Sequence, residues 1–348
     1  MAKSSIQSLQ VFRGFAALSV VAHHAGLSTE AFVGTMPTAV SELLVFGLLG
    51  VDFFFVLSGF IIMYAHFDDE RGTTTVKRYA FKRLTRIFPA YWPVGLGLLV
   101  LYASLPGLSA GGGREYSWVS SLLLVPANGP PALSVAWTLV HELLFYGIFM
   151  LFFVSRRGLV VALLAWAVLI LVANQFFSPS GWLRYPLSFL NIEFMLGVGA
   201  ALLVRSEAVE RKGKGAALLG GTMACFALWL MATEIGVWPR LLFALGLALV
   251  IVGFAVREQT VVLRWPVSML ILGNASYSIY LVHNPLLSLT QRVAGVLAMS
   301  WPIAMLMGVT LSVAAGWAYH RLVEAPALRW FRSHTPLDPK APTKPLRV

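Results

Sequence analysis

The chain has 348 residues, of which 58% are hydrophobic and only 12% are charged, and its mean hydropathy is +0.77. This composition excludes an ordinary soluble domain, because apolar runs of about 20 residues recur along it and each can cross a hydrocarbon core of about 30 Å. The single cysteine, Cys225, excludes a disulfide framework and a cysteine-clustered metal site, and no metal is predicted. The predicted fold class is an all-α polytopic membrane protein.

Ten transmembrane helices are predicted, with the N- and C-termini in the cytoplasm. They cover residues 9–26, 42–64, 87–105, 133–154, 158–177, 184–204, 215–233, 238–256, 267–289 and 301–320. This orientation places 22 of the 26 Lys and Arg residues on the inside, as the positive-inside rule requires. The net charge of +11 is thereby explained by topology, so no nucleic-acid partner is predicted.

The chain is predicted to form one membrane domain, residues 1–328, followed by a disordered cytoplasmic tail, residues 329–348, that is rich in proline. The first span is expected to stay uncleaved, because it lacks a clear A-x-A site.

The first apolar segment, QVFRGFAALSVVAHHAG at residues 10–26, carries Arg13 near its start and two histidines near its end. Arg13 and His24 are eleven residues apart, about 1100° of helix rotation, so they share a face to within roughly 20° and lie about 16 Å apart along the axis. Neither is needed to hold a helix in lipid, so the pair indicates a site. His23 points about 100° away and is predicted to pack against a neighbouring helix.

Three carboxylates lie within predicted spans: Asp52, Glu142 and Glu193. Each is nine or ten positions from the outer end of its span, which predicts one layer of acids about 14–15 Å deep. Ionisable groups are costly inside a bilayer, so each is a candidate functional residue. The alternative is that they form structural hydrogen bonds between helices.

Two spans carry further polar side chains near these acids. Tyr146 follows Glu142 by four residues and shares its helix face, while Trp137 lies at the outer boundary, where tryptophan is an ordinary anchor. In the second span, Ser58 and its neighbouring glycines allow helices to approach closely.

The span 267–289 carries one stripe of four polar side chains, Ser276, Tyr280, His283 and Asn284. Pro285 is predicted to break the helix just after this stripe. A single histidine on an apolar helix is often only a satisfied structural residue, but the whole stripe favours a site as much as a structural role.

The loop before the third span reads KRYAFKRLTRIF and places Arg83 and Arg86 at the cytoplasmic mouth of that span. Forked guanidinium donors suit phosphates, so these arginines are predicted to bind a phosphate-bearing acyl donor such as a coenzyme A thioester. The alternative is a plain basic flank. Histidine can then serve as general base or nucleophile toward an acceptor hydroxyl.

These segments resemble the motifs of acyltransferase family 3, the integral-membrane O-acyltransferases that include exopolysaccharide, O-antigen and nodulation-oligosaccharide O-acetyltransferases. The resemblance covers about residues 7–328. It rests on Arg13-x10-His24, GVDFFFVLSGF at 50–60, Arg83-x-x-Arg86, the WTL…E…FY pattern of Trp137, Glu142 and Tyr146, SYSIYLVH at 276–283 and Glu324-x-Pro326.

The resemblance implies a cytosolic acyl-CoA co-substrate, usually acetyl-CoA, with no bound cofactor, and a sugar hydroxyl acceptor at the outer side of the bacterial inner (plasma) membrane. It implies that His24 is catalytic and that Arg13, Arg83 and Arg86 act in donor binding. The chain departs from the exopolysaccharide-modifying members at His141, where they tend to have Tyr. Some members add a C-terminal SGNH-type hydrolase domain, and this chain is expected to be a stand-alone version.

The sequence therefore predicts a membrane O-acyltransferase in which His24 deprotonates a sugar hydroxyl or carries the acyl group, with Glu142 or Asp52 orienting an imidazole. Residues predicted to bind substrate or support the site are Tyr146, Trp137, Ser58, Tyr280, His283, Asn284 and Glu193. The alternative is a proton-coupled transporter or flippase of a lipid-linked sugar or small metabolite. A purely structural protein would leave the buried ionisable groups unexplained. The acceptor, the acyl group and the oligomeric state stay open.

Overall fold

The structure is a computed structural model, and it describes residues 6–105, 107, 115–206, 213–233 and 237–333. In this part of the chain the regular elements are helices. They are α1 (Gln7–Phe32), α2 (Thr38–Val45), α3 (Gly50–His66), α4 (Thr73–Ser104), α5 (Trp118–Leu123), α6 (Trp137–Phe149), α7 (Arg156–Phe176), α8 (Leu190–Arg205), α9 (Gly213–Thr233), α10 (Val237–Thr260), α11 (Val267–Val296), α12 (Trp301–Tyr319) and α13 (Ala325–Ser333).

Short 3-10 turns at Phe46–Leu49, Ser134–Ala136, Met150–Phe153 and Gly181–Arg184 extend or join these helices, and a π-helical segment, His320–Glu324, joins α12 to α13. Within the described residues, seven helical segments are long and apolar enough to cross a membrane. Each of the ten predicted spans overlaps a helix, but α8 has only 16 residues, and α1 and α11 carry polar side chains along their length. The predicted class, an all-helical multi-pass membrane protein, is confirmed.

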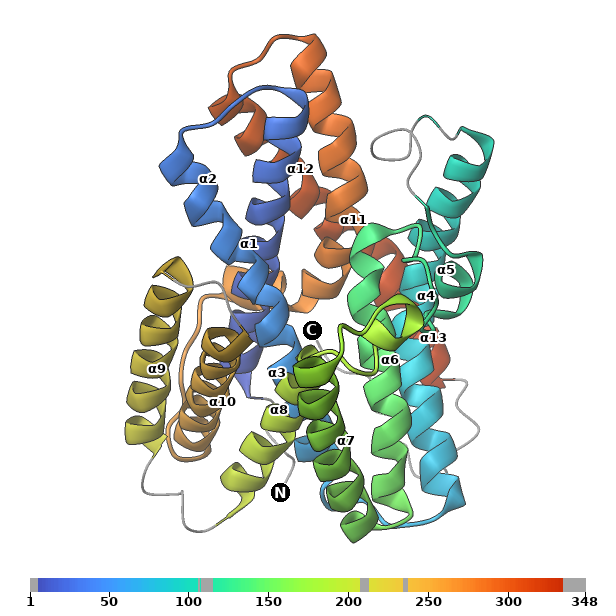
Figure 1. The fold of residues 1–348 in the computed structure, drawn as a ribbon, viewed down its shortest axis with the longest axis vertical. Coiled ribbons are helices and arrows are strands. Elements are labelled where there is room, and N and C mark those ends of the chain that lie inside the picture. The colour runs from blue at the N-terminus through green and yellow to red at the C-terminus, as the bar shows by residue number, and fades with distance from the viewer. Residues whose placement is uncertain (1–5, 106, 108–114, 207–212, 234–236, 334–348) are drawn as a thin grey trace.

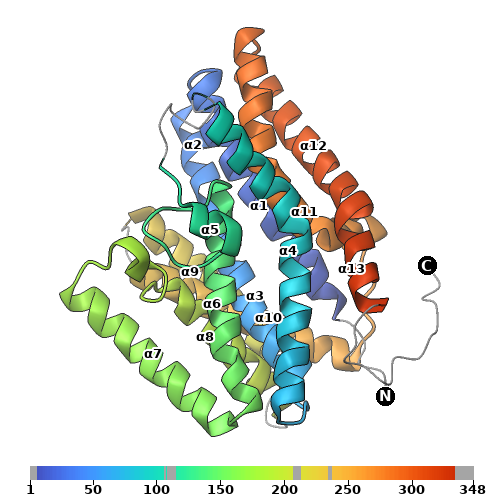
Figure 2. The same cartoon turned by 90° about the vertical axis from the view of Figure 1, so that its right-hand side faces the viewer.

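The helices pack in a small number of close pairs. The helices α1, α11 and α12 lie side by side in both ribbon views, and α9 lies against α10 at one flank (Figures 1 and 2). The helices α3 and α8 cross at glycines: a Cβ atom on Gly197 would lie 1.9 Å from the Val56 carbonyl oxygen, and one on Gly59 would lie 2.0 Å from that of Phe194. Backbone therefore meets backbone, the contact that small residues permit inside membranes.

The densest part of the core lies between α3, α6 and α8. The rings of Phe55 and Phe194 are 4.8 Å apart, and those of Phe145 and Phe194 are 4.5 Å apart and stacked. Such ring pairs fix the rotation of helices about their axes more closely than aliphatic contacts do. This rotation decides which polar side chains of α3 and α6 face the interior.

Two local predictions were wrong. The basic segment before the third span is not a loop, because α4 begins at Thr73 and carries Arg83 and Arg86 one helical turn apart. Pro285 does not break α11, which continues to Val296. A proline removes only one intrahelical hydrogen bond, and the packed neighbours of α11 keep the rest of the helix in place.

The predicted tail lies mostly outside the described residues. The helix α13 continues to Ser333, so its last part, residues 329–333, is helical, and residues 334–348 are not described.

Candidate active site

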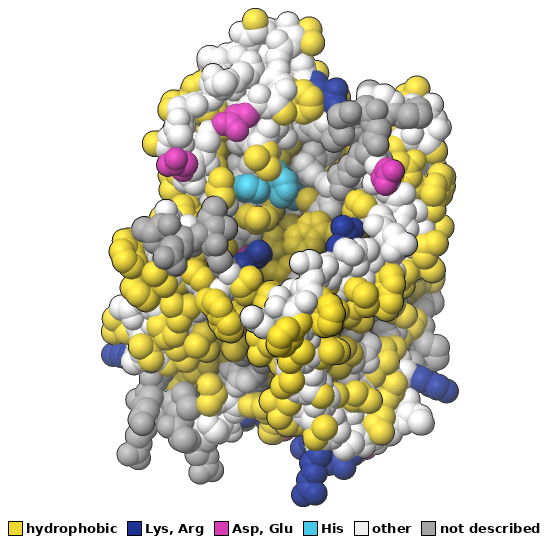
Figure 3. Space-filling view, viewed as in Figure 1, with side chains coloured by type: hydrophobic (Ala, Val, Ile, Leu, Met, Phe, Trp, Pro, Cys, Tyr) yellow, Lys and Arg dark blue, Asp and Glu magenta, His cyan; other side chains and the backbone are white. Residues whose placement is uncertain are grey.

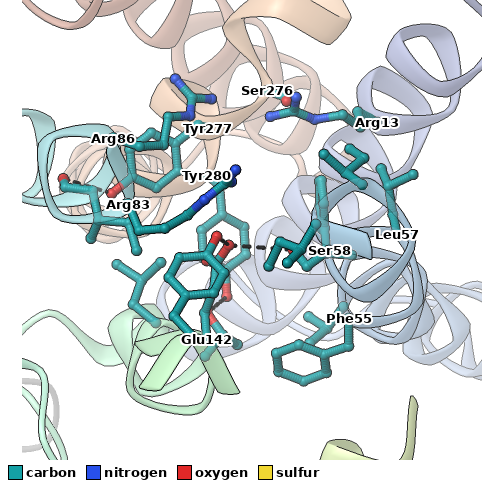
Figure 4. Close-up of a pocket in the computed structure, with 18 residues that line it drawn as sticks. Arg13, Phe55, Leu57, Ser58, Arg83, Arg86, Glu142, Ser276, Tyr277 and Tyr280 are labelled. Atoms are coloured by element: carbon teal, nitrogen blue, oxygen red, sulfur yellow. Dashed lines mark hydrogen bonds between the residues drawn. The ribbon is translucent and has the colours of Figure 1, made fainter. Parts of the chain in front are cut away.

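A cavity of about 180 Å³ lies among α1, α3, α4, α6 and α11 (Figure 4). It brings together seven residues singled out in the sequence: Arg13, Ser58, Arg83, Arg86, Glu142, Tyr146 and Tyr280. These residues come from five helices that are far apart in the chain. Ser276 of the predicted polar stripe also lines the cavity, as do two residues that were not predicted, Thr138 and Tyr277.

One end of this cavity is strongly basic. The side chains of Arg13, Arg83 and Arg86 point toward the same space from α1 and α4 (Figure 4). Glu142 is the one carboxylate among the described lining residues. Arg86 is compensated by Glu324, so Arg13 and Arg83 facing the single carboxylate of Glu142 leave an excess of positive charge in a confined space, which favours an anionic ligand.

The arginines differ in what holds them. Arg86 forms an ion pair with the buried carboxylate of Glu324, which also accepts hydrogen bonds from Ser278 Oγ at 2.6 Å and His320 Nδ1 at 2.8 Å. Arg83 Nη2 instead lies 2.9 Å from His66 Nε2. Arg86 thus has a carboxylate partner within the protein, whereas Arg83 contacts a histidine and has no carboxylate partner among the described residues.

The carboxylate of Glu142 is fixed by two hydroxyl donors. Ser58 Oγ donates to Glu142 Oε1 at 3.3 Å, and the Tyr146 hydroxyl donates to the same oxygen. The predicted facing of Glu142 and Tyr146 on α6 is therefore confirmed. The bond from Ser58 joins α3 to α6, the bond from Tyr146 lies within α6, and together they set the orientation of the carboxylate at the cavity wall.

His24 lies outside this cavity, against a second histidine. Its Nδ1 is 3.0 Å from the Val20 carbonyl oxygen and 3.3 Å from Nε2 of His283. A neutral imidazole that donates from Nδ1 to a carbonyl keeps a lone pair on Nε2. His24 Nε2, for which no described residue provides a hydrogen bond, is then the basic nitrogen.

Tyr280 connects the histidine pair to the cavity. Its ring lines the cavity and lies 5.6 Å from the ring of His283. Its hydroxyl is 2.9 Å from Thr138 Oγ1 and 3.0 Å from the Val135 carbonyl oxygen. Histidine side chains are visible in a hollow on one face of the molecule (Figure 3).

The predicted layer of three acids divides into two sites. Asp52 and Glu193 are buried and both face Arg240: Arg240 Nη2 donates to Asp52 Oδ2 at 3.0 Å, and its Nε is 3.9 Å from Glu193 Oε1. Asp52 therefore has an arginine partner, and the structure does not bring it into contact with the imidazole of His24. Glu142 lies apart from this pair, in the basic cavity.

The remaining predicted residues make structural contacts. Asn284 donates to Ser134 Oγ, and the Trp137 ring lies 5.7 Å from that of His141. His23 Nδ1 lies 3.0 Å from the Leu44 carbonyl oxygen, so its predicted packing role is confirmed. His141 has its Nδ1 3.2 Å from the side-chain oxygen of Asn191.

Sequence reasoning missed two cation partners. Arg240 was not singled out in the sequence, although two buried acids without a cation indicate that a cation must reach them. His66 precedes the basic segment and gave no signal beyond its position. Among the described residues, no group of three or more His, Cys, Asp or Glu side chains could hold a metal ion.

Apolar helices with buried ionisable side chains around a basic cavity define an integral-membrane protein with an internal polar site. The chain belongs to acyltransferase family 3, whose sequence profile, described as an acyltransferase domain, matches residues 6–321. The suspected family is confirmed, and the chain is an O-acyltransferase.

Three relatives illustrate the range of similarity. The chain is 32% identical over 297 residues to the exopolysaccharide production protein ExoZ of Rhizobium meliloti, covering 81% of this chain and 90% of ExoZ. It is 26% identical to the acyltransferase MdmB of Streptomyces mycarofaciens, covering 95% and 94%. It is 23% identical to the peptidoglycan O-acetyltransferase OatA of Listeria monocytogenes, covering 83% of this chain and half of OatA. No solved structure matches the chain.

Proposed function

We propose that this O-acyltransferase moves an acyl group, most simply acetyl, from cytosolic acyl-CoA to a hydroxyl of a cell-surface or lipid-linked carbohydrate. The observation that carries the proposal is the cavity with three arginines and one carboxylate beside the His24–His283 pair. The similarity to ExoZ, an exopolysaccharide production protein, and to OatA, a peptidoglycan O-acetyltransferase, supports a carbohydrate acceptor.

The proposed topology has ten spans, both termini in the cytoplasm and a location in the bacterial inner membrane. In this orientation Arg83 and Arg86 lie toward the cytosol, and His24, about 16 Å along α1 from Arg13, lies in the outer half of the bilayer. Donor and acceptor then approach the reacting atoms from opposite sides of the membrane.

The cavity is too small to enclose a whole coenzyme A, because pockets that bury drug-sized ligands measure about 300–1,000 Å³ and this one measures about 180 Å³. The nucleotide end would therefore stay at the mouth, where Arg83 and Arg86 bind its phosphates. The thioester end would enter alone, past Arg13 and toward Glu142 and Tyr280. Because Tyr280 separates the cavity from the histidines, its side chain must move for the thioester to reach His24.

In the proposed reaction, Nε2 of His24 accepts the proton of the sugar hydroxyl as its oxygen attacks the thioester carbonyl. The carbon–sulfur bond breaks, and the departing thiolate takes the proton, so the products are the ester and free coenzyme A. In the alternative sequence, His24 Nε2 first carries the acyl group and passes it to the hydroxyl. His283 is positioned to orient His24 in either case, and Glu142 is the carboxylate available to the donor.

The test is acetyl transfer by His24→Ala in a membrane-inserted preparation. The matched control is His23→Gln, because the adjacent His23 bonds the Leu44 carbonyl oxygen through Nδ1, a contact that an amide can replace. General acid–base catalysis contributes about 10²–10⁴-fold, so His24→Ala should lose at least that factor while His23→Gln keeps most of the activity. Normal transfer by His24→Ala would contradict the proposal. Movement of a lipid-linked sugar without consumption of labelled acetyl-CoA would favour the transporter instead.

A further inference from the structure

A second cavity of about 870 Å³, separate from the basic one, lies between α9, α10 and the segment that follows α10. The two helices are antiparallel and pack at Gly220 and Gly246, where an added Cβ on Gly220 would lie 2.4 Å from the Gly246 carbonyl oxygen. The pair lies at the flank of the bundle (Figure 1). The groove is therefore reached from the surrounding lipid rather than from the active site.

One end of this groove carries three exposed cations: Lys214 in the first turn of α9, Arg257 near the end of α10, and Arg264 just after it. No carboxylate is found among the described lining residues. The adjacent acid, Glu258, accepts instead from the backbone N–H groups of Gln7 and Ser8, at 2.7 and 2.8 Å. In the described part of the chain, none of the three cations has an ion-pair partner.

The rest of the groove is apolar and as deep as one leaflet. Its wall is formed by Leu218, Gly221, Cys225, Phe254 and Trp265, among others. From Lys214 to Cys225 is eleven residues, about 16 Å of helix, which is close to half of a hydrocarbon core of about 30 Å. The Thr222 hydroxyl donates to carbonyl oxygens of its own helix, so it adds no free donor to the wall.

The positive-inside rule alone would place these three cations on the cytoplasmic side, but it would not require them to line the same groove. Two other basic side chains have internal partners: Arg205 pairs with Asp68 at 2.9 Å, and Arg156 donates to the Phe67 carbonyl oxygen at 2.9 Å. The three cations of the groove instead lie together at one end of its apolar wall. This combination matches a phospholipid, whose phosphate needs cations and whose acyl chain needs an apolar wall of leaflet depth.

We propose that this groove binds an anionic phospholipid, with its phosphate on Lys214, Arg257 and Arg264 and one acyl chain along α9. The site does not depend on the proposed donor or acceptor. Binding holds together the exposed helix α9, which packs mainly against α10, and the segment 261–265 that leads into α11.

The test is native mass spectrometry of the purified protein with added phosphatidylglycerol, phosphatidylcholine or glycerol 3-phosphate. The wild type should retain phosphatidylglycerol over phosphatidylcholine. Arg257→Gln with Arg264→Gln should lower that retention about tenfold or more. The matched control, Arg329→Gln with Arg332→Gln on α13, removes two exposed cations outside the groove and should retain the lipid. Equal retention by both double variants, or of both lipids by the wild type, would overturn the proposal.

A second variant separates a lipid from a free phosphate. No atom lies within 4 Å of a Cβ placed on Gly221, so Gly221→Leu projects into the groove without a clash. It should exclude phosphatidylglycerol although all three cations remain. Unchanged lipid retention by this variant, or displacement of the lipid by glycerol 3-phosphate, would show that the apolar wall is not occupied.

The native cysteine reports occupancy without any substitution. Cys225 is the single cysteine of the chain, is exposed and lines the groove. In phosphatidylcholine nanodiscs, addition of phosphatidylglycerol should slow its alkylation by a maleimide in the wild type and in the α13 control. The Arg257→Gln with Arg264→Gln variant should lose this protection, and protection that persists there would contradict the assignment of the phosphate to these arginines.

Discussion

The two arginines on α4 are expected to respond very differently to the same substitution. Arg86→Gln leaves the carboxylate of Glu324 without its arginine, and the side chain of Glu324 has no exposed surface. Breaking a buried ion pair by removing one partner costs about 3–5 kcal/mol. Because 30% of the Arg86 side chain is exposed, water offsets part of this loss and the lower end of the range, about 3 kcal/mol, applies.

The assay is thermal unfolding of the detergent-purified variants, followed by aggregation or intrinsic fluorescence. At about 2 °C per kcal/mol, Arg86→Gln should unfold about 6 °C below the wild type. Arg83→Gln leaves no buried carboxylate without a partner, because Arg83 contacts His66. Its unfolding midpoint should therefore stay within about 2 °C of the wild type, while its KM for acetyl-CoA rises. Combining Arg86→Gln with Glu324→Gln should restore most of the lost stability. Equal midpoints for Arg83→Gln and Arg86→Gln would refute the reasoning.

Two further predictions test helix packing and the second charged cluster. Gly197→Ala should prevent the close α3–α8 contact and lower the yield of folded protein in size-exclusion chromatography, because the added Cβ would lie 1.9 Å from the Val56 carbonyl oxygen. Gly199→Ala is the control and should be neutral, because its Cβ would meet no atom within 4 Å. Arg240→Gln should destabilise the protein by about 3 kcal/mol in the same unfolding assay, and adding Asp52→Asn should recover part of the loss. A well-folded Gly197→Ala would show that the close α3–α8 contact is not needed. Failure of Asp52→Asn to recover stability in the Arg240→Gln background would show the same for the Arg240–Asp52 ion pair.

Much of the site could be predicted from sequence because it depends on spacing within single helices. Arg13 and His24 lie on one uninterrupted helix, and Glu142 bonds Tyr146 one turn away. Contacts between helices were harder to predict, because hydropathy gives the depth of a residue in the membrane but not the rotation of its helix about its axis. Thus Asp52 was expected near an imidazole, yet it pairs with Arg240, which is 188 positions away in the sequence.

The helix boundaries show the same limit. Arg83 and Arg86 were assigned to a loop because a basic segment outside the hydrocarbon core has no apolar periodicity to mark a helix. The structure extends α4 back to Thr73, well before residue 87, where the third span was predicted to begin. Pro285 was assigned as a break because local propensity favours one, and the neighbours that hold α11 together are visible only in three dimensions.

The position of Tyr280 bears on whether protons can leak through the protein. A membrane protein that places charged groups and histidines close together in its interior risks conducting protons, each of which gains about 2.3 kcal/mol per 100 mV on crossing. The Tyr280 hydroxyl is held by Thr138 and the Val135 carbonyl, and its ring lines the arginine-rich cavity and lies 5.6 Å from the ring of His283. A single aromatic side chain, held at its hydroxyl, thus lies between the arginines and the histidines, and in the proposed reaction the movement that admits the thioester to His24 is also the movement that would open a proton path.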